Sequence, residues 1–530
     1  MKRHGVYVNC DPDTLGFFAQ ANNFELSDCK EKLVRYFQSY AGRGISDILF
    51  SIFEQSSIVP TKVLTWRAEK YDRKTENGIP VDYSDNLGTL FVKGVRDVYA
   101  ALGADGGDPY QILFDAAKDA GMHPWMTLRM NDAHYHGDKT AYLRGDIYYE
   151  AVRNGWTIRD GNGYYDTCFD FGVPEIRERM LDYIREQLGR YDCYGLELDF
   201  MREIYCFSDR FDTETRVSMM NDFVRAVRAA LDAREAALGH PMKLCVRLMR
   251  DIAQNRLFGF DAETWVKEGL VDVLVPAPRW ASTDSDLPIP AWKALCEGTK
   301  TEVCAGLEIL ALYPYNNTAE TVRGFAKQYA DAGADQIYLN NYFCIRTPEP
   351  DPALVGPDGF FGKVWHDTAA ADELCGNRRH LVTEQDIAPD SCERFSPLPV
   401  TFTGETTLSV LTGSAAEREE MSVILGTEDG QEISAVFLDG VRTESAGETD
   451  DSFFRRPPES YFNVPNPHEK THFHLFRVPA FDRGAVRHTV RVCAEKEVTI
   501  KTAEIVIREA SADRNRLSRL SVNTADLATQ

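Results

Sequence analysis

Residues 195–202 read Gly-Leu-Glu-Leu-Asp-Phe-Met-Arg, and this stretch decides the fold. Large apolar residues alternate with Glu197 and Asp199, as in a β-strand whose successive side chains point to opposite sides. The apolar side must face a layer of helices. The two carboxylates therefore point to the other side, which in a closed barrel is the interior.

Comparable apolar runs recur from residue 5 to about 345, separated by segments with helical periodicity. We expect Asp261 and Asn317 to cap two of these helices, with Glu320 completing the second cap. The expected strands are residues 5–11, 46–53, 123–131, 194–201, 243–249, 271–277, 302–308 and 335–343. Eight strands, each followed by a helix, favour an α/β fold of the (β/α)8 TIM-barrel type. No glycine-rich nucleotide loop follows a strand, which disfavours an open doubly wound sheet.

Two connections and the C-terminal third complete the expected architecture. Segments 54–83 and 132–171 are much longer than ordinary βα loops and would roof a pocket at the C-terminal face of the barrel. Period-two alternation then predicts strands at 406–411, 421–425, 433–438, 472–478, 488–493 and 498–507, which is typical of a β-sandwich. We expect a barrel over 1–379, a sandwich over 380–510 and a polar tail over 511–530.

The composition excludes several classes of partner. The chain has 59 Lys+Arg against 82 Asp+Glu and a net charge of −23, so binding to nucleic acid or to an anionic membrane is disfavoured. No apolar segment is long enough for a secretory signal or a membrane helix, and we expect a cytoplasmic protein. The 12 cysteines form no CxxC pair or Cys/His cluster, so we expect neither a structural metal nor a cofactor.

Polar residues gather at the C-terminal ends of the expected strands. The same alternation that turns Glu197 and Asp199 inward also predicts an inward position for Asn9, Asp11, Thr127, Arg129, Asn131, Arg247, Glu308, Tyr338 and Asn340. Catalytic groups of barrel enzymes lie at these strand ends, so an enzyme is the main hypothesis. The alternative is an ion-pair network that only fills the barrel.

Inward carboxylates indicate glycoside hydrolysis, which commonly uses an acid and a base. In one arrangement Glu197 or Asp199 acts together with Glu308, as in a retaining glycosidase. In the other, Asp11 and Asp13 lie opposite the segment 129–136, where a histidine could exchange a proton near neutral pH.

Arginines also collect around the expected barrel rim. They are Arg129, Arg202, Arg247, Arg250, Arg279 and Arg346. So many guanidinium groups in an acidic protein favour bidentate capture of a carboxylate, sulfate or phosphate. The alternative is that they are salt-bridge partners of the inward acids.

Three segments resemble glycoside hydrolase family 156, the inverting exo-sialidases. They are Asn9-Cys-Asp11, Arg129-Met-Asn-Asp-Ala-His134 and the stretch 195–202. The resemblance covers the barrel and the sandwich. It implies a catalytic pair made of an Asp after the first strand and a His after the third. His134 matches the His, with His136 as a nearby rival for that role or a residue that contacts the substrate, and Asp13 or Asp11 matches the Asp.

The resemblance further implies a small anionic sugar, sialic acid on a glycan, as the partner. Arg129, Arg202 and Arg247 would hold its carboxylate. Asn131, Asn340 and Asn341 would contact its hydroxyl or N-acyl groups. A third hypothesis is a non-catalytic carbohydrate-binding protein whose sandwich binds sugar or forms a homodimer.

Overall fold

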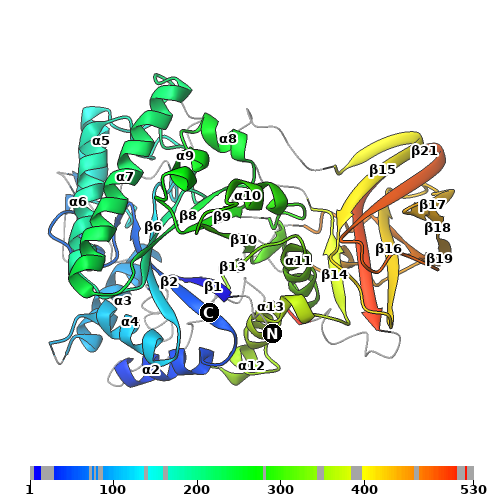
Figure 1. Cartoon of the computed structure of the whole chain (residues 1–530), viewed down its shortest axis with the longest axis horizontal. Coiled ribbons are helices and arrows are strands. Elements are labelled where there is room, and N and C mark those ends of the chain that lie inside the picture. Colours follow the sequence, from blue (N-terminus) through cyan, green and yellow to red (C-terminus); the bar gives the residue numbers. More distant parts are fainter. Residues whose placement is uncertain are drawn as a thin grey trace.

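The computed structural model describes residues 5–12, 29–70, 75–76, 79–80, 87–104, 106–136, 141–158, 165–278, 282–342, 351–383, 397–458, 465–509 and 520–521. These residues form a (β/α)8 barrel and, beside it, a C-terminal antiparallel β domain (Figure 1).

All eight expected barrel strands are present. They are β1 (Gly5–Cys10), β2 (Ile45–Glu54), β6 (His123–Arg129), β7 (Gly195–Asp199), β8 (Lys243–Met249), β9 (Val273–Ala277), β10 (Glu302–Glu308) and β13 (Gln336–Asn340). Neighbours pair in parallel around the ring, and β1 pairs with both β2 and β13, which closes the barrel. The barrel predicted from the alternation is confirmed.

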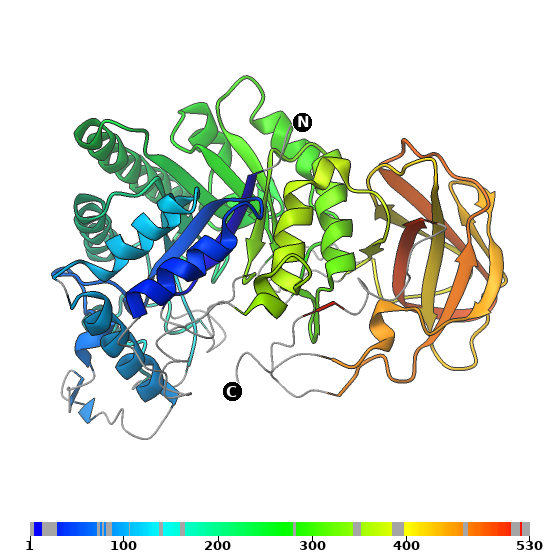
Figure 2. The ribbon, with the colours of Figure 1, turned by 90° about the horizontal axis from the view of Figure 1, so that it is seen from below.

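Helices cover the outer side of the barrel sheet, as Figure 2 shows from below. They are α2 (Cys29–Tyr40), α3 (Leu87–Leu102), α4 (Pro109–Asp119), α5 (Asp146–Asn154), α6 (Pro174–Arg190), α7 (Thr213–Leu238), α8 (Ile252–Leu257), α9 (Ala262–Lys267), α10 (Ile289–Leu295), α11 (Ala319–Asp331), α12 (Pro352–Val355) and α13 (Phe360–Ala369). Short elements within the connections are β3 (Ser56–Ser57), η1 (Arg67–Lys70), β4 (Thr75–Glu76), β5 (Ile79–Pro80), β11 (Leu310–Leu312), β12 (Tyr315–Asn316) and η2 (Ala371–Glu373).

The helix starts follow the capping residues, with one correction. Asp261 caps α9, as expected, by accepting from the Thr264 N–H. The N-cap of α11 is Thr318, and Thr321 completes its capping box, so the predicted cap at Asn317 is wrong by one residue. Asn317 is unavailable because its side-chain amide donates instead to the carbonyl of Glu308, at 2.9 Å.

The barrel interior contains the residues that the alternation turned inward. Thr127 and Tyr338, on strands at different positions in the ring, donate to the same Glu197 oxygen at 2.5 and 3.2 Å. The ring of Tyr7 lies 5.7 Å from that of Trp125 and 6.5 Å from that of Tyr338. The inward direction of Glu197, Thr127 and Tyr338 is confirmed.

The C-terminal domain is one continuous antiparallel sheet folded over an apolar core. Its elements are β14 (Arg378–Leu381), β15 (Val400–Leu411), β16 (Glu419–Thr427), β17 (Ala435–Leu438), β18 (Val441–Arg442), β19 (Glu444–Glu448), η3 (Phe453–Arg455), β20 (His472–Arg477) and β21 (Arg487–Glu509). The strands expected at 488–493 and 498–507 are the two halves of β21. This 23-residue strand pairs with β15 and β17 in its first half and with β14 and β16 in its second.

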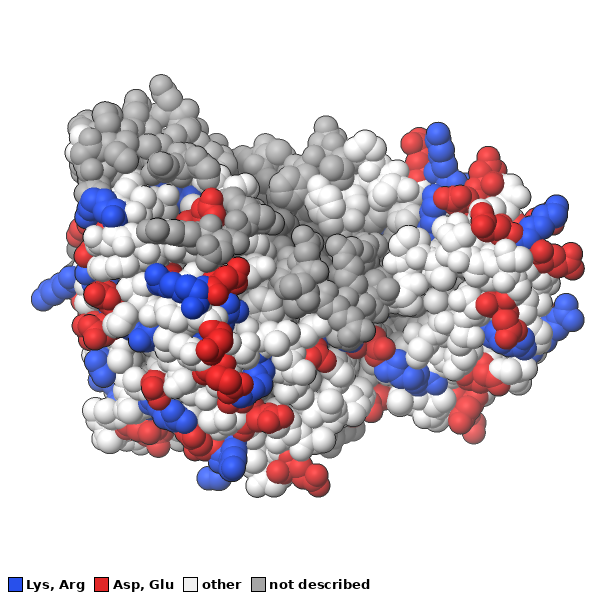
Figure 3. Space-filling view, turned by 90° about the horizontal axis from the view of Figure 1, so that it is seen from above, with Lys and Arg blue, Asp and Glu red and all other residues white. Residues whose placement is uncertain are grey.

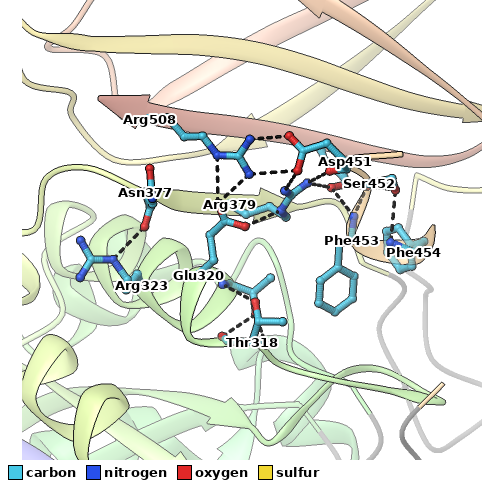
Figure 4. A network of polar contacts seen from close by, with 12 residues as sticks. Thr318, Glu320, Arg323, Asn377, Arg379, Asp451, Ser452, Phe453, Phe454 and Arg508 are labelled. Atoms are coloured by element: carbon cyan, nitrogen blue, oxygen red, sulfur yellow. Dashed lines mark hydrogen bonds and ion pairs between the residues drawn. The ribbon is translucent and has the colours of Figure 1, made fainter. Parts of the chain in front are cut away.

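Helix α11 of the barrel packs against the β domain (Figures 1 and 4). Gly324 allows its close approach, since a Cβ atom there would lie 2.1 Å from the carbonyl oxygen of Arg379 on β14. Arg379 donates to Glu320 of α11 at 3.0 Å and to Glu504 of β21 at 2.5 Å. Arg508 binds the other Glu320 oxygen at 2.9 Å, so a buried ion network spans the junction (Figure 4).

The described surface carries charges of both signs. Lys and Arg side chains are interspersed with Asp and Glu over both domains in the view of Figure 3. The nine cysteines whose side chains the structure describes are all free thiols. None of the described helices is long and apolar enough to cross a membrane.

Candidate active site

Polar side chains lie level with one another at the C-terminal ends of the barrel strands. In the strand register Arg129 is paired with Asp199, and Asp199 with Arg247. Further around the ring, Glu308 is paired with Asn340. Because register partners on parallel strands point the same way, these residues line the mouth of the barrel together.

Arg129 is held at the mouth by two acids. Its Nη2 donates to Asp11 Oδ2 at 2.8 Å, and its Nη1 donates to Glu54 at the end of β2. The side chain is 14% exposed. The other Asp11 oxygen, Oδ1, is buried and has no hydrogen-bond partner among the described residues. The Arg129 guanidinium is therefore partly reachable from the mouth of the barrel.

His134 is oriented by Asp132, two residues before it on the loop after β6. Asp132 Oδ1 accepts from the His134 backbone N–H at 2.7 Å and from Nδ1 at 2.8 Å. The Asp132 side chain is fully buried, whereas 41% of the His134 side chain is exposed. The carboxylate thus places the ring proton on Nδ1 and leaves the lone pair on Nε2.

Arg202, just beyond β7, contacts the same histidine. Its Nη2 lies 3.0 Å from His134 Nδ1 and closer still to Nε2, and its Nε lies 3.6 Å from Asp132 Oδ2. Burial and the Arg202 charge lower the pKa of His134 below its usual value, against the opposing effect of Asp132. Burial would raise the pKa of Asp132, but His134, Arg202 and Arg129 together hold it well below its usual value.

A buried clamp holds the histidine loop. The Gln55 amide donates to the carbonyl of Asp132 and accepts from Arg144. Arg144 also donates to the carbonyls of His134 at 3.1 Å and Tyr135 at 2.7 Å. Gln55 and Arg144 are buried, so they fix the backbone that carries His134 without reaching the solvent.

Strained backbone marks the same region. Four described non-glycine residues have positive φ, and three of them lie at this end of the barrel: Gln55 at 60°, Tyr135 at 55° and Asn341 at 63°. The fourth, Asp439, lies in the β domain. A left-handed conformation is unfavourable for side chains with a Cβ and persists where surrounding contacts enforce it, often at functional sites.

A second polar group occupies the opposite side of the mouth. Asn340 and Asn341 donate to the two Glu308 oxygens at 2.6 and 2.9 Å, and the Asn341 backbone N–H donates to Asn9 at 2.6 Å. Burial raises the pKa of Glu308, while Arg247 and the two amides oppose the shift. A carboxyl with a raised pKa can act as a proton donor.

Asp199 and Glu197 lie between these groups. Asp199 accepts from Arg247 at 3.2 Å, and the Arg247 side chain is only 4% exposed. Glu197 lies one layer deeper, and burial together with the neighbouring Asp199 raises its pKa to about 7. The deeper position separates Glu197 from the exposed part of the mouth.

The remaining predicted residues fall into three groups. Asp13, Arg279 and Arg346 lie outside the described residues. The Asn131 amide is engaged by the loop backbone, since it donates to the carbonyls of Phe169 and Tyr205 and accepts from the Phe169 N–H. His136 is exposed, and Arg250 donates to Asp284 at 2.6 Å.

Sequence reasoning missed Asp132, Glu54, Gln55 and Arg144. The Asp-x-His spacing was the available signal for Asp132, because one carboxylate can then accept from both the backbone and the ring of the histidine. Glu54 is the last residue of β2, one residue beyond the expected strand, and Gln55 follows it. No local pattern indicates Arg144.

Among the residues that the structure describes, no group of three or more His, Cys, Asp or Glu side chains is placed to hold a metal ion.

Comparison with known proteins identifies neither a family nor an activity for this chain. No family model and no curated protein matches it. The α-L-fucosidase isoenzyme 1 from Paenibacillus thiaminolyticus aligns at 12% identity and a TM-score of 0.34, over 93% of this chain and 97% of that one. An α-L-fucosidase from Bacteroides thetaiotaomicron aligns at 10% identity and a TM-score of 0.36, over 96% of this chain and 94% of that one. The endo-β1,6-glucanase BT3312 aligns at 10% identity and a TM-score of 0.36, over 94% of this chain and 92% of that one.

Fold and site together define the class of the protein as a (β/α)8 barrel with a charged, partly buried site at its C-terminal face. Within that class, its particular feature is a histidine positioned by a buried aspartate and contacted by an arginine.

Proposed function

We propose that the protein is a glycoside hydrolase that releases terminal sialic acid from sialosides with inversion at the anomeric carbon. The observation that carries the proposal is the contact series Asp132–His134–Arg202 beside Arg129 at the barrel mouth. It combines a neutral imidazole, suited to accept a proton, with two partly exposed guanidinium groups suited to a sugar carboxylate.

In the proposed reaction a water molecule attacks the anomeric carbon and gives its proton to His134 Nε2. The bond from the anomeric carbon to the glycosidic oxygen breaks, and a carboxylic acid protonates the leaving oxygen. Asp13 is our first candidate for that acid, with Asp11 as the alternative. Asp11 is the ion-pair partner of Arg129, which favours a binding role for it.

Arg129 and Arg202 would hold the sugar carboxylate, since each is about one-seventh exposed. Arg247 is nearly buried against Asp199, so it would act on the sugar carboxylate from beneath the site, through its ion pair with Asp199. Asn340 and Asn341 could present hydrogen-bonding groups to the sugar from the Glu308 side of the mouth.

The test is hydrolysis of an aryl α-sialoside, with the anomeric form of the first product read by NMR. We expect the β-anomer first. His134→Ala should lower kcat about 10²–10⁴-fold, the usual contribution of a proton-transfer residue. His366→Ala, a change at an exposed position on α13, should leave kcat unchanged. Unchanged turnover in His134→Ala would contradict the proposal.

A second candidate is a retaining glycosidase that uses Glu197 or Asp199 with Glu308. The raised pKa of Glu308 and its place at the mouth favour this alternative. It predicts retention of configuration and loss of activity in Glu308→Gln. Sialic acid binding without turnover of any sialoside would instead support a non-catalytic sugar-binding protein.

A further inference from the structure

Both ring nitrogens of His134 are engaged in the structure. Nδ1 donates to Asp132 at 2.8 Å, and the Arg202 guanidinium contacts Nε2. Nε2 is the atom that the proposed reaction needs, because Nδ1 already carries the proton. In this arrangement an attacking water cannot use the lone pair of Nε2, since Arg202 donates to it.

The charges that face the ring come from two loops. Asp132 and Arg129 belong to the end of β6 and its loop, and Arg202 follows β7. Glu54 of β2 acts at one remove, through its contact with Arg129. Arg202 is the only one of these groups that contacts Nε2 among the described residues.

We propose that Arg202 makes the histidine base dependent on a carboxylated sugar. Without ligand its guanidinium occupies Nε2 of His134. A sugar carboxylate that binds Arg202 draws the guanidinium away and frees Nε2 for water. This inference rests on the proposed function, and it names the residue that would couple substrate recognition to catalysis.

The competition favours the carboxylate. An arginine–carboxylate pair is charge-assisted and often bidentate, whereas a neutral imidazole offers a single uncharged acceptor. Arg202 is 15% exposed, so a ligand in the mouth can reach it. A neutral sugar of the same shape would bind without releasing the base, so discrimination should appear in kcat as well as in KM.

The experiment is an NMR titration of the His134 ring in protein labelled at histidine, with N-acetylneuraminic acid and its methyl ester as probes. The proteins are wild type, Arg202→Gln and the control Arg185→Gln, which changes an arginine that is 56% exposed on α6. In the wild type, the free acid should raise the pKa of His134 and the methyl ester should not. Arg202→Gln should raise that pKa without ligand, because a positive charge beside the ring is gone.

The response of the Arg202→Gln variant to the ligand distinguishes two causes of a rise in the pKa of His134. One is the withdrawal of Arg202 from the ring, and the other is the direct electrostatic effect of the bound carboxylate. We expect no further rise in the pKa of His134 when saturating acid binds this variant, and wild-type behaviour from Arg185→Gln. An equal rise in wild type and Arg202→Gln would overturn the inference while leaving the proposed function in place. Binding of the acid with no change at His134 would do the same. Failure of the wild type to bind the acid would overturn both.

Discussion

Asp132→Asn tests the candidate site most directly, because it removes one charge and keeps the side-chain size. Four donors lie within 4 Å of the carboxylate: the His134 backbone N–H, His134 Nδ1 at 2.8 Å, Arg202 Nε at 3.6 Å and Arg129 Nη1 at 3.8 Å. An amide can accept on one atom only. Either orientation therefore turns N–H bonds toward donors and removes the charge that stabilises a protonated imidazole.

We expect Asp132→Asn to lower kcat by about 10²–10⁴-fold, equivalent to about 3–5 kcal/mol on the activation barrier. KM should change little, because the Asp132 side chain is fully buried and cannot touch the sugar. The pKa of His134 should fall further, since Asp132 is the group that raises it. Steady-state kinetics on an aryl α-sialoside and NMR titration of His134 measure the two effects.

Asp182→Asn is the matched control, an exposed aspartate on α6 that pairs with Arg185. It should leave both kcat and the pKa of His134 at their wild-type values. A folded Asp132→Asn protein, shown by an unchanged circular dichroism spectrum, with wild-type kcat would refute the role of Asp132 in positioning the base.

Three further changes probe the support of the site and the fold. Gln55→Ala should lower kcat at least about tenfold with little change in KM, because the loop that carries His134 loses its buried clamp. Arg379→Ala should lower the free energy of unfolding, measured in urea, by about 3–5 kcal/mol, since two buried carboxylates lose a partner. Glu197→Gln should flatten the pH dependence of stability. The wild-type free energy of unfolding should fall as pH rises from the ordinary glutamate pKa toward about 7, because burial raises the folded-state pKa and disfavours the charged form. We expect this fall in the wild-type free energy of unfolding to reach on the order of 3 kcal/mol at pH 7.

Two of these changes have a matched control. Arg418→Ala changes an arginine that is 70% exposed and should alter the free energy of unfolding by less than about 0.5 kcal/mol. Glu178→Gln, at an exposed position on α6, should keep the wild-type pH profile. A steep profile in Glu197→Gln, or wild-type stability in Arg379→Ala, would contradict the corresponding argument. For Gln55→Ala, a rise in KM alone would contradict a positioning role.

Much of the barrel could be predicted because its determinants are local. Alternation along residues 195–199 reports directly which side chains enter the interior, and Glu197 there meets Thr127 and Tyr338 as expected. The same alternation predicts that Arg129, Arg247 and Glu308 point into one end of the barrel, where the strand register places them. A strand end can thus be assigned from the sequence without knowing its neighbours.

The contacts within the site depend on loop paths that no periodic pattern encodes. Arg144 donates to the carbonyl of His134, ten residues before it, and Gln55 meets Asp132 across two different connections. The β domain shows the same limit, since β21 continues through a stretch where the sequence suggested a break between two strands.

The strand positions, the direction of their side chains and the acidic character of the chain follow from the sequence, because alternation and composition are properties of the chain alone. The contacts of His134 with Asp132 and with Arg202 depend on the three-dimensional fold. Those contacts arise where the parallel pairing of β6 with β7 brings the ends of the two strands side by side, and a few ångströms there determine which charge shifts which pKa.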